Sequence, residues 1–352
     1  VDVNEIDLTT TIPAVATSIG VHVLRDTWKG PELKRQLIND IDELIETFGR
    51  PTDDSYEDIL AGAGFLQYGN NLYCTRVLAP SATFSGAYGT VASGGTFTQY
   101  TSSDAYKLSD LDSEDPDEFG NEDSVFDVGK AENGSEMAFI ASSRGSWGNY
   151  VQIAIIGRDA FDGVKQGSTA TSLGLSATLY DDIDNNGGDV NFSSDKEFLI
   201  IVKRAKQEDI NKSTIPYSVV EVMLVSSDPT AVDDTGANIF VENYVNNNSR
   251  YIRVATTAAF KNQSYKNKYQ ADYTTFGGGV MNNGDSVLDG DIIEAFELYQ
   301  DSEEIDVNIF IDSNKSTTVK QSIQSICSDR KDAIAVLDVP KSLVVNNKGS
   351  EA

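Results

Sequence analysis

Apolar residues recur at helical spacing near the start of the chain. The apolar positions between residues 33 and 48 fall three or four residues apart, which predicts a helix. A second helix is expected from an aspartate cap at 53 or 54 to residue 66, and short β-rich runs at 21–24 and 72–78 flank the pair. The first unit is therefore predicted to be β-α-α-β.

A similar alternation returns near the other end of the chain. The spacing of apolar residues predicts a helix over 289–300, a strand over 307–311, a helix over 317–328 and a strand over 333–337. Helices and strands in regular succession favour an α/β layer, so the two terminal units are expected to complete one another.

The middle of the chain has a different pattern. Its apolar residues form short runs rich in β-branched and aromatic side chains, separated by polar and glycine-rich connectors, which predicts a β-rich region. The expected strands are 137–141, 150–156, 178–180, 197–203, 219–225 and 251–254, with 239–245 as a short helix or a strand.

These patterns predict a multidomain fold of the α+β or α/β class, with a discontinuous α/β core domain and an inserted β-rich, sandwich-like domain. Nine carboxylates fall between Asp110 and Asp127, and such a density of like charge favours a solvated surface loop. The predicted divisions are an extended N-terminal arm at 1–19, the core at 20–80 plus 284–345, the insertion at 81–283 with an acidic loop at about 101–135, and a tail at 346–352.

The charge balance narrows the classes of function. The 352 residues include 55 acidic and 27 basic side chains, a formal net charge of -28, so most of the surface repels a nucleic-acid backbone. No apolar run reaches the roughly 20 residues of a membrane helix, so neither nucleic-acid binding nor membrane insertion is expected. The two cysteines, Cys74 and Cys327, are expected to be reduced thiols of a protein made in a cytoplasm.

Catalytic motifs are not apparent in the sequence. The single histidine, His22, lies within a β run, and no Gly-x-Ser-x-Gly turn or cysteine–histidine cluster accompanies it. A phosphate loop is not indicated at Gly277-Gly278-Gly279 either, because no Gly-Lys-Ser/Thr follows it, so we interpret it as a tight connection between domains. We therefore expect no enzyme activity and no cofactor.

One segment has the spacing of a calcium loop. Asp182, Asp184 and Asn186 precede Gly187 in an Asp-x-Asp-x-Asn-Gly pattern, but the twelfth position is Ser193 in place of a bidentate Glu. A turn rich in Asn and Gly would account for the same residue pattern without a bound ion. Two rival functions stay open on these grounds: a calcium-dependent binding or adhesion module, and a hydrolase that uses a carboxylate pair which nothing in the sequence selects.

Several motifs follow one another along the chain in an order that is informative when they are taken together. The most specific is Gly145-Ser146-Trp147-Gly148-Asn149-Tyr150 before a strand, in which an indole can close a domain edge and Asn149 can cap exposed backbone. The other segments are 12–18, 29–31, 48–49, 70–77, 220–227, 236–241, 248–249, 251–254, 277–279, 305–307, 309–311 and 329–340. Taken together and in this order, these segments resemble the tail sheath proteins of contractile-tailed phages.

The resemblance implies a structural subunit that polymerises around a tail tube and contracts to drive the tube through the host envelope for genome delivery. Its implied partners are other copies of itself, the tail tube protein, and baseplate and tail terminator proteins, and its implied place is the virion, after assembly in the host cytoplasm. Relatives continue into a C-terminal domain beyond the position that matches Pro340. On this basis we expect a truncated chain that is monomeric, with an arm at 1–19 suited to adding a strand to a neighbour's sheet.

Overall fold

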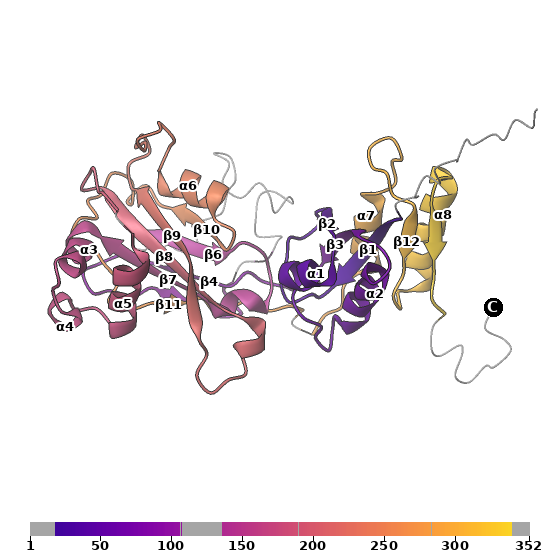
Figure 1. Ribbon diagram of the computed structural model, residues 1–352, viewed down its shortest axis with the longest axis horizontal. Coiled ribbons are helices and arrows are strands. Elements are labelled where there is room, and N and C mark those ends of the chain that lie inside the picture. Colours follow the sequence, from indigo (N-terminus) through magenta and orange to yellow (C-terminus); the bar gives the residue numbers. More distant parts are fainter. Residues whose placement is uncertain (1–17, 106, 108–135, 189, 283, 340–352) are drawn as a thin grey trace, which may run out of the picture.

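The computed structural model describes residues 18–105, 107, 136–188, 190–282 and 284–339. The molecule is elongated, with two lobes side by side (Figure 1). The α/β lobe carries β1–β3, β12, β13, α1, α2, α7 and α8, and the β-rich lobe carries the elements between β3 and α7. Nearly all of the predicted arm at 1–19, most of the predicted acidic loop at 101–135 and the tail at 346–352 lie outside the described residues.

A five-stranded sheet forms the centre of the α/β lobe, in the order β13-β12-β1-β3-β2. All its neighbouring strands are parallel except β2, which is antiparallel to β3. The central strand, β1, is buried along almost its whole length, as expected for a strand covered on both faces. The strands are β1 (Ile19–Arg25), β2 (Gln36–Ile38), β3 (Asn71–Val77), β12 (Ile309–Ile311) and β13 (Ile334–Val336).

Helices cover both faces of this sheet. Phe296 and Val319 come from α7 and α8 and pack on one face, whereas Leu44 and Ile59 come from α1 and α2 and pack on the other. The apolar residues whose spacing predicted these helices therefore face the sheet. The helices are α1 (Ile41–Phe48), α2 (Tyr56–Leu66), α7 (Asp289–Glu297) and α8 (Thr317–Arg330).

The predicted helix over 33–48 is wrong in its first half. Leu33 has a left-handed φ of 50°, and residues 36–38 form β2 instead. The helix begins only after Asp40, whose side chain accepts a hydrogen bond of 2.8 Å from the backbone N–H of Glu43. Pairing of Leu37 with Tyr73 of β3 thus outweighs the local helical pattern.

Two four-stranded sheets build the β-rich lobe, in the orders β10-β6-β4-β5 and β11-β7-β8-β9, and every neighbouring pair in them is antiparallel. One apolar core joins the two sheets, with Phe139 and Val254 from the first and Ile155 and Ile200 from the second. The strands are β4 (Gly86–Gly89), β5 (Thr98–Gln99), β6 (Met137–Ala141), β7 (Val151–Gly157), β8 (Glu197–Ala205), β9 (Tyr217–Ser226), β10 (Ile252–Thr256) and β11 (Thr274–Thr275).

Short helices complete this lobe. Phe161 of α3 and Leu179 of α5 pack against the second face of β7 and β8. The predicted strand at 178–180 is wrong, because α5 spans it, and of the two alternatives for 239–245 the helix is realised as α6. The helices are α3 (Arg158–Lys165), α4 (Ala170–Leu173), α5 (Ala177–Asn186) and α6 (Val241–Asn248), with 3-10 turns η3 (Ser146–Tyr150) and η4 (Gln207–Asp209).

The fold is thus mixed α/β, with one mostly parallel sheet and two antiparallel sheets. The mostly parallel sheet takes β1–β3 from the start of the chain and β12–β13 from its end, whereas the domain boundaries near 80 and 284 stay a prediction. None of the helices in the described ranges has the length and apolar character needed to span a bilayer.

Candidate functional site at the junction of the two lobes

The Trp147 motif lies where the two lobes meet. Trp147 is 3% exposed, and its indole N–H donates to the carbonyl (3.2 Å) and hydroxyl (3.0 Å) of Ser143. Trp28 precedes β2 in the α/β lobe, yet its side chain belongs to the same buried core as Trp147. Both tryptophans of the chain therefore close the β-rich core on the side of the α/β lobe.

The triple glycine lies directly against this motif. The side-chain amide of Asn149 donates to the carbonyl of Gly279 at 2.8 Å, and its oxygen accepts from the Gly279 N–H at 3.0 Å. A Cβ on Gly279 would lie 1.9 Å from the hydroxyl of Ser85, and Gly278 has a φ of +83°. The structure thus brings together two sequence motifs that are 130 residues apart, in a contact that only glycine fits.

A buried ion cluster crosses the junction beside them. Glu32 of the α/β lobe is 3% exposed and accepts from Arg144 of the β-rich lobe through Nη2 at 2.6 Å, Nε at 2.9 Å and the backbone N–H at 3.1 Å. Arg76 of β3 lies 3.5 Å from the same carboxylate and donates to the carbonyl of Arg144 at 3.1 Å. Three charged side chains therefore connect the two lobes in a region that is shielded from solvent.

The charges of this cluster make each of its three side chains depend on the others. Burial lowers the pKa of Arg76 to about 10, Glu32 raises it, and Arg144 lowers it further. Arg76 stays charged at neutral pH with one carboxylate shared between two guanidiniums, so loss of that carboxylate leaves buried positive charge without compensation.

Exposed contacts add a second link between the lobes. The side-chain oxygen of Gln207 accepts from the backbone N–H of Arg50 at 2.6 Å, and the Arg50 guanidinium pairs with Glu208 at 2.6 Å. These groups are solvated, so they contribute little to stability compared with the buried cluster.

A cleft of about 600 Å³ also lies between the lobes. Five cationic and three acidic side chains line it, which is an unusual balance in a chain of net charge -28. Burial lowers the pKa of Lys29 in its wall to about 8, and Arg204 lowers it further. The cations are Lys29, Lys34, Arg204, Arg250 and Arg253.

The candidate calcium residues do not surround a common point. Asp182, Asp184 and Asn186 lie on α5, where positions two residues apart point to different sides of a helix. The Asp182 carboxylate accepts instead from Lys203 Nζ at 2.6 Å and from the Tyr273 hydroxyl at 2.9 Å. Across the described ranges, no three histidine, cysteine or acidic side chains are grouped as a metal site.

The single histidine has a structural environment. His22 is fully buried, with Nδ1 3.1 Å from the carbonyl of Ile311 and Nε2 3.0 Å from that of Asp58. Burial lowers the pKa of His22 to about 4, and the nearby Lys315 ammonium lowers it further. Burial also acts to raise the pKa of Asp58, but Lys315 and the guanidinium of Arg25 outweigh it and hold this pKa well below its usual range.

Sequence reasoning missed the Glu32–Arg144–Arg76 cluster. The one available signal was Arg76 itself, a charged residue within the apolar strand 72–78, since a buried cation requires a partner. Its partners lie 44 and 68 residues away, and their connectors gave no periodic pattern.

Comparison with known proteins finds a partial sequence match. No protein-family model matches the sequence. A tail sheath protein of Vibrio phage KVP40 is 27% identical over 142 residues, which are 38% of this chain and 20% of that protein.

Solved sheath tail proteins are also similar. One from Listeria innocua matches 91% of this chain and 47% of its own length, at 12% identity and a TM-score of 0.46. One from Desulfitobacterium hafniense matches 91% of this chain and 49% of its own length, at 11% identity and a TM-score of 0.42. The chain thus spans about half the length of these solved proteins.

The sequence match confirms the predicted resemblance: over these 142 residues the chain is similar to a phage tail sheath protein.

Proposed function

We propose that the chain is a structural subunit of a contractile tail sheath that polymerises around a tail tube and shortens to drive the tube through the host envelope. The observation that carries this proposal is the 142-residue match to a phage tail sheath protein. The proposed partners are further copies of the chain, the tube protein, and baseplate and terminator proteins, and the proposed location is the virion tail.

The junction suits a subunit that transmits force. Trp28, Trp147 and the Glu32–Arg144–Arg76 cluster tie the two lobes together through buried contacts. Separation of the lobes would leave these buried charges without partners, so we expect the junction to carry a load from one lobe to the other as a unit.

An open sheet edge offers a surface for a neighbouring copy. β13 pairs only with β12 among the described residues, and two of its apolar side chains are exposed: Ile334 at 62% and Val336 at 52%. The Ile334 N–H bonds to Asn308 at 2.9 Å, so the backbone groups of the next residue, Ala335, face away from β12. An apolar edge of this kind is a template for strand addition, and the arm at 1–19 of another copy is the proposed added strand.

The lobe cleft offers a second contact. Its five cations would attract an acidic surface, and the net charge of -28 makes another copy of the chain such a surface. We expect this contact to weaken as salt is raised, because solvated charges are screened.

Electron microscopy of the purified protein, expressed from its full gene, tests the proposal. Wild type and an Ala335→Ser control are expected to form rings or tubes. Ala335→Pro removes one outward N–H at the edge of the sheet, so it is expected to keep the fold by circular dichroism but to lose assembly. A gene product that stays a single particle at all concentrations counts against the sheath role, whereas normal tubes from Ala335→Pro count only against strand addition at β13.

A further inference from the structure

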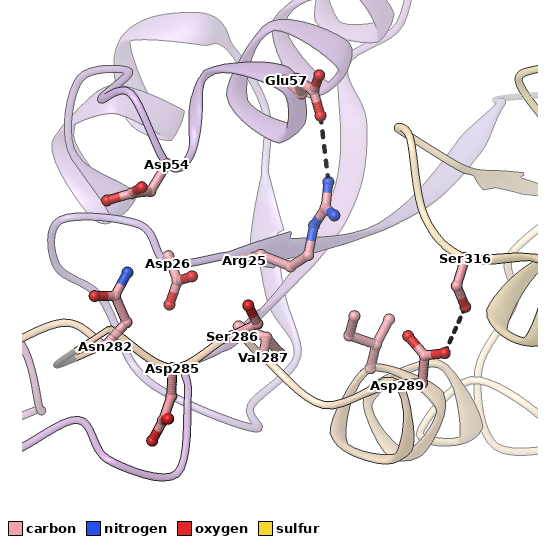
Figure 2. A pocket seen from close by; sticks show the side chains of 11 residues that line it. Arg25, Asp26, Asp54, Glu57, Asn282, Asp285, Ser286, Val287, Asp289 and Ser316 are labelled. Atoms are coloured by element: carbon pink, nitrogen blue, oxygen red, sulfur yellow. Dashed lines mark hydrogen bonds and ion pairs between the residues drawn. The ribbon is translucent and has the colours of Figure 1, made fainter. Parts of the chain in front are cut away.

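A small acidic cavity lies in the α/β lobe, apart from the junction. It has a volume of about 300 Å³ and is formed by the end of β1, the approach to α2, the segment that leads into α7, and the start of α8 (Figure 2). Its lining includes one guanidinium, that of Arg25, and five carboxylates: Asp26, Asp54, Glu57, Asp285 and Asp289.

Asp26 is the unusual member of this group. Its side chain is 8% exposed, and its Oδ1 atom is buried without a hydrogen-bond partner among the described residues. Figure 2 shows the Asp26, Asn282 and Ser286 side chains turned toward the same space. A buried carboxylate oxygen with no donor is unfavourable, so its position calls for an explanation.

The charges of Arg76 and Arg25 act to lower the pKa of Asp26, but neither guanidinium of these described residues forms a salt bridge with its carboxylate. Arg25 donates to Asp58 at 2.9 and 3.0 Å and to the carbonyls of Ser313 and Asn314. No ion pair within the described ranges involves Asp26, and burial together with the charge of Asp54 raises the pKa of Asp26 to about 6.

Helix termini account for some of the acidic residues but not for Asp26. Glu57 and Asp289 lie in the first turns of α2 and α7, where the helix dipole favours negative charge. Asp26 follows the last residue of β1 and is held there by its N–H, which donates to the carbonyl of Val77 at 3.1 Å. Its carboxylate also accepts a hydrogen bond from the backbone N–H of Ala79, which leaves Oδ1 as the oxygen without a donor.

We propose that this cavity binds a guanidinium or ammonium group, with Asp26 Oδ1 as the central acceptor and Asp54 and Asp285 as flanking carboxylates. A metal ion fits less well, because no three acidic side chains of the described residues converge on one point. A guanidinium presents five donors in a fork and can bridge acceptors that lie several ångströms apart. The net charge of -28 attracts such a cation before it binds.

The cation has two possible sources, a free amine or guanidine and an arginine or lysine side chain of another polypeptide. Both satisfy the same acceptors, so the experiment separates them. The inference does not depend on the proposed sheath role.

Amide chemical shifts, measured by NMR on the full chain, provide the test. The probes are methylguanidinium at low millimolar concentration, the peptide acetyl-Gly-Arg-Gly-amide and its citrulline analogue, which lacks the charge. The charged probes are expected to cause saturable shifts near Asp26, Asp54 and Ser286, and the citrulline peptide none. Arginine-peptide binding at least tenfold tighter than that of methylguanidinium identifies a polypeptide source, whereas equal affinities identify a free cation; both results support the cavity as the receptor.

Variants keep the test independent of folding. Asp26→Asn is expected to weaken arginine-peptide binding at least tenfold. The exposed Asp285→Asn is expected to weaken it two- to threefold, and Asp234→Asn, on the surface of the other lobe, not at all. Unchanged binding by a folded Asp26→Asn overturns the proposal, as do equal shifts with the citrulline peptide. Saturable shifts at the same residues with Mg²⁺ but not with methylguanidinium also overturn it, in favour of a metal site.

Discussion

Replacement of Glu32 by glutamine is expected to lower the free energy of unfolding by about 3–5 kcal/mol. The carboxylate accepts three hydrogen bonds from Arg144 and contacts Arg76, and all three side chains are at most 5% exposed. Glutamine has nearly the same shape, so little of the loss comes from packing. It turns an NH₂ group toward two guanidiniums and leaves both charges in a desolvated site.

The expected loss is measured by urea unfolding followed through tryptophan fluorescence. Trp28 and Trp147 are the only tryptophans, and both are buried in the core at this junction, so the signal reports on the region that is changed. At about 2 °C per kcal/mol for a chain of this size, the melting temperature is expected to fall by roughly 6–10 °C.

A solvated ion pair between the same two lobes supplies the control. Glu208→Gln breaks the contact with Arg50, in which both side chains are about half exposed, so it is expected to change stability by at most about 1 kcal/mol. If Glu32→Gln changes stability no more than Glu208→Gln does, the reasoning from burial is refuted.

Three further predictions concern other parts of the molecule. Gly279→Ala is expected to destabilise by about 1–3 kcal/mol, because the added methyl meets Ser85, whereas Gly290→Ala in the open first turn of α7 is expected to stabilise by about 0.5–1 kcal/mol; similar melting temperatures for the two variants would contradict the close contact. The pKa of Asp26 is about 6 in the folded protein and 3.8 in the unfolded chain, so its contribution to stability is full below pH 4 and is lost as the pH rises to 6. The unfolding free energy of wild type minus that of Asp26→Asn should therefore fall between pH 4 and pH 6. A difference that does not change with pH contradicts the raised pKa. Millimolar calcium is expected to leave the melting temperature unchanged, because the carboxylate of Asp182, on α5, is already paired with the buried ammonium of Lys203. A calcium-dependent rise in melting temperature that Asp182→Asn abolishes would restore the binding-module hypothesis.

Periodic patterns predicted the α/β lobe well, because its helices each bury one apolar face. The failure at 33–48 has a local cause: Leu33 and Leu37 continue the helical spacing backwards from Ile41, and only the cap at Asp40 marks the true start. For α5, β-branched and aromatic residues at 178–180 suggested a strand, although Leu179 and Ile183, four residues apart and both buried, carried the helical signal.

The site could be predicted only in pieces. The Trp147 motif and the triple glycine were each recognisable, but the bonds between Asn149 and Gly279 depend on tertiary contact across 130 residues. Asp26 gave no signal, because an aspartate after a strand is ordinary in sequence and becomes unusual only when its burial is known.

The order of strands in the five-stranded sheet has a consequence for biosynthesis. β1 lies at its centre, yet the partner on one side, β12, begins 232 residues after the end of β3, from residue 77 to residue 309. At about 5–20 residues per second, a ribosome needs roughly 10–50 s to supply that partner. During this interval the nascent chain displays an apolar strand with one vacant side, so we expect chaperone engagement at this stage of translation, before the last two strands emerge.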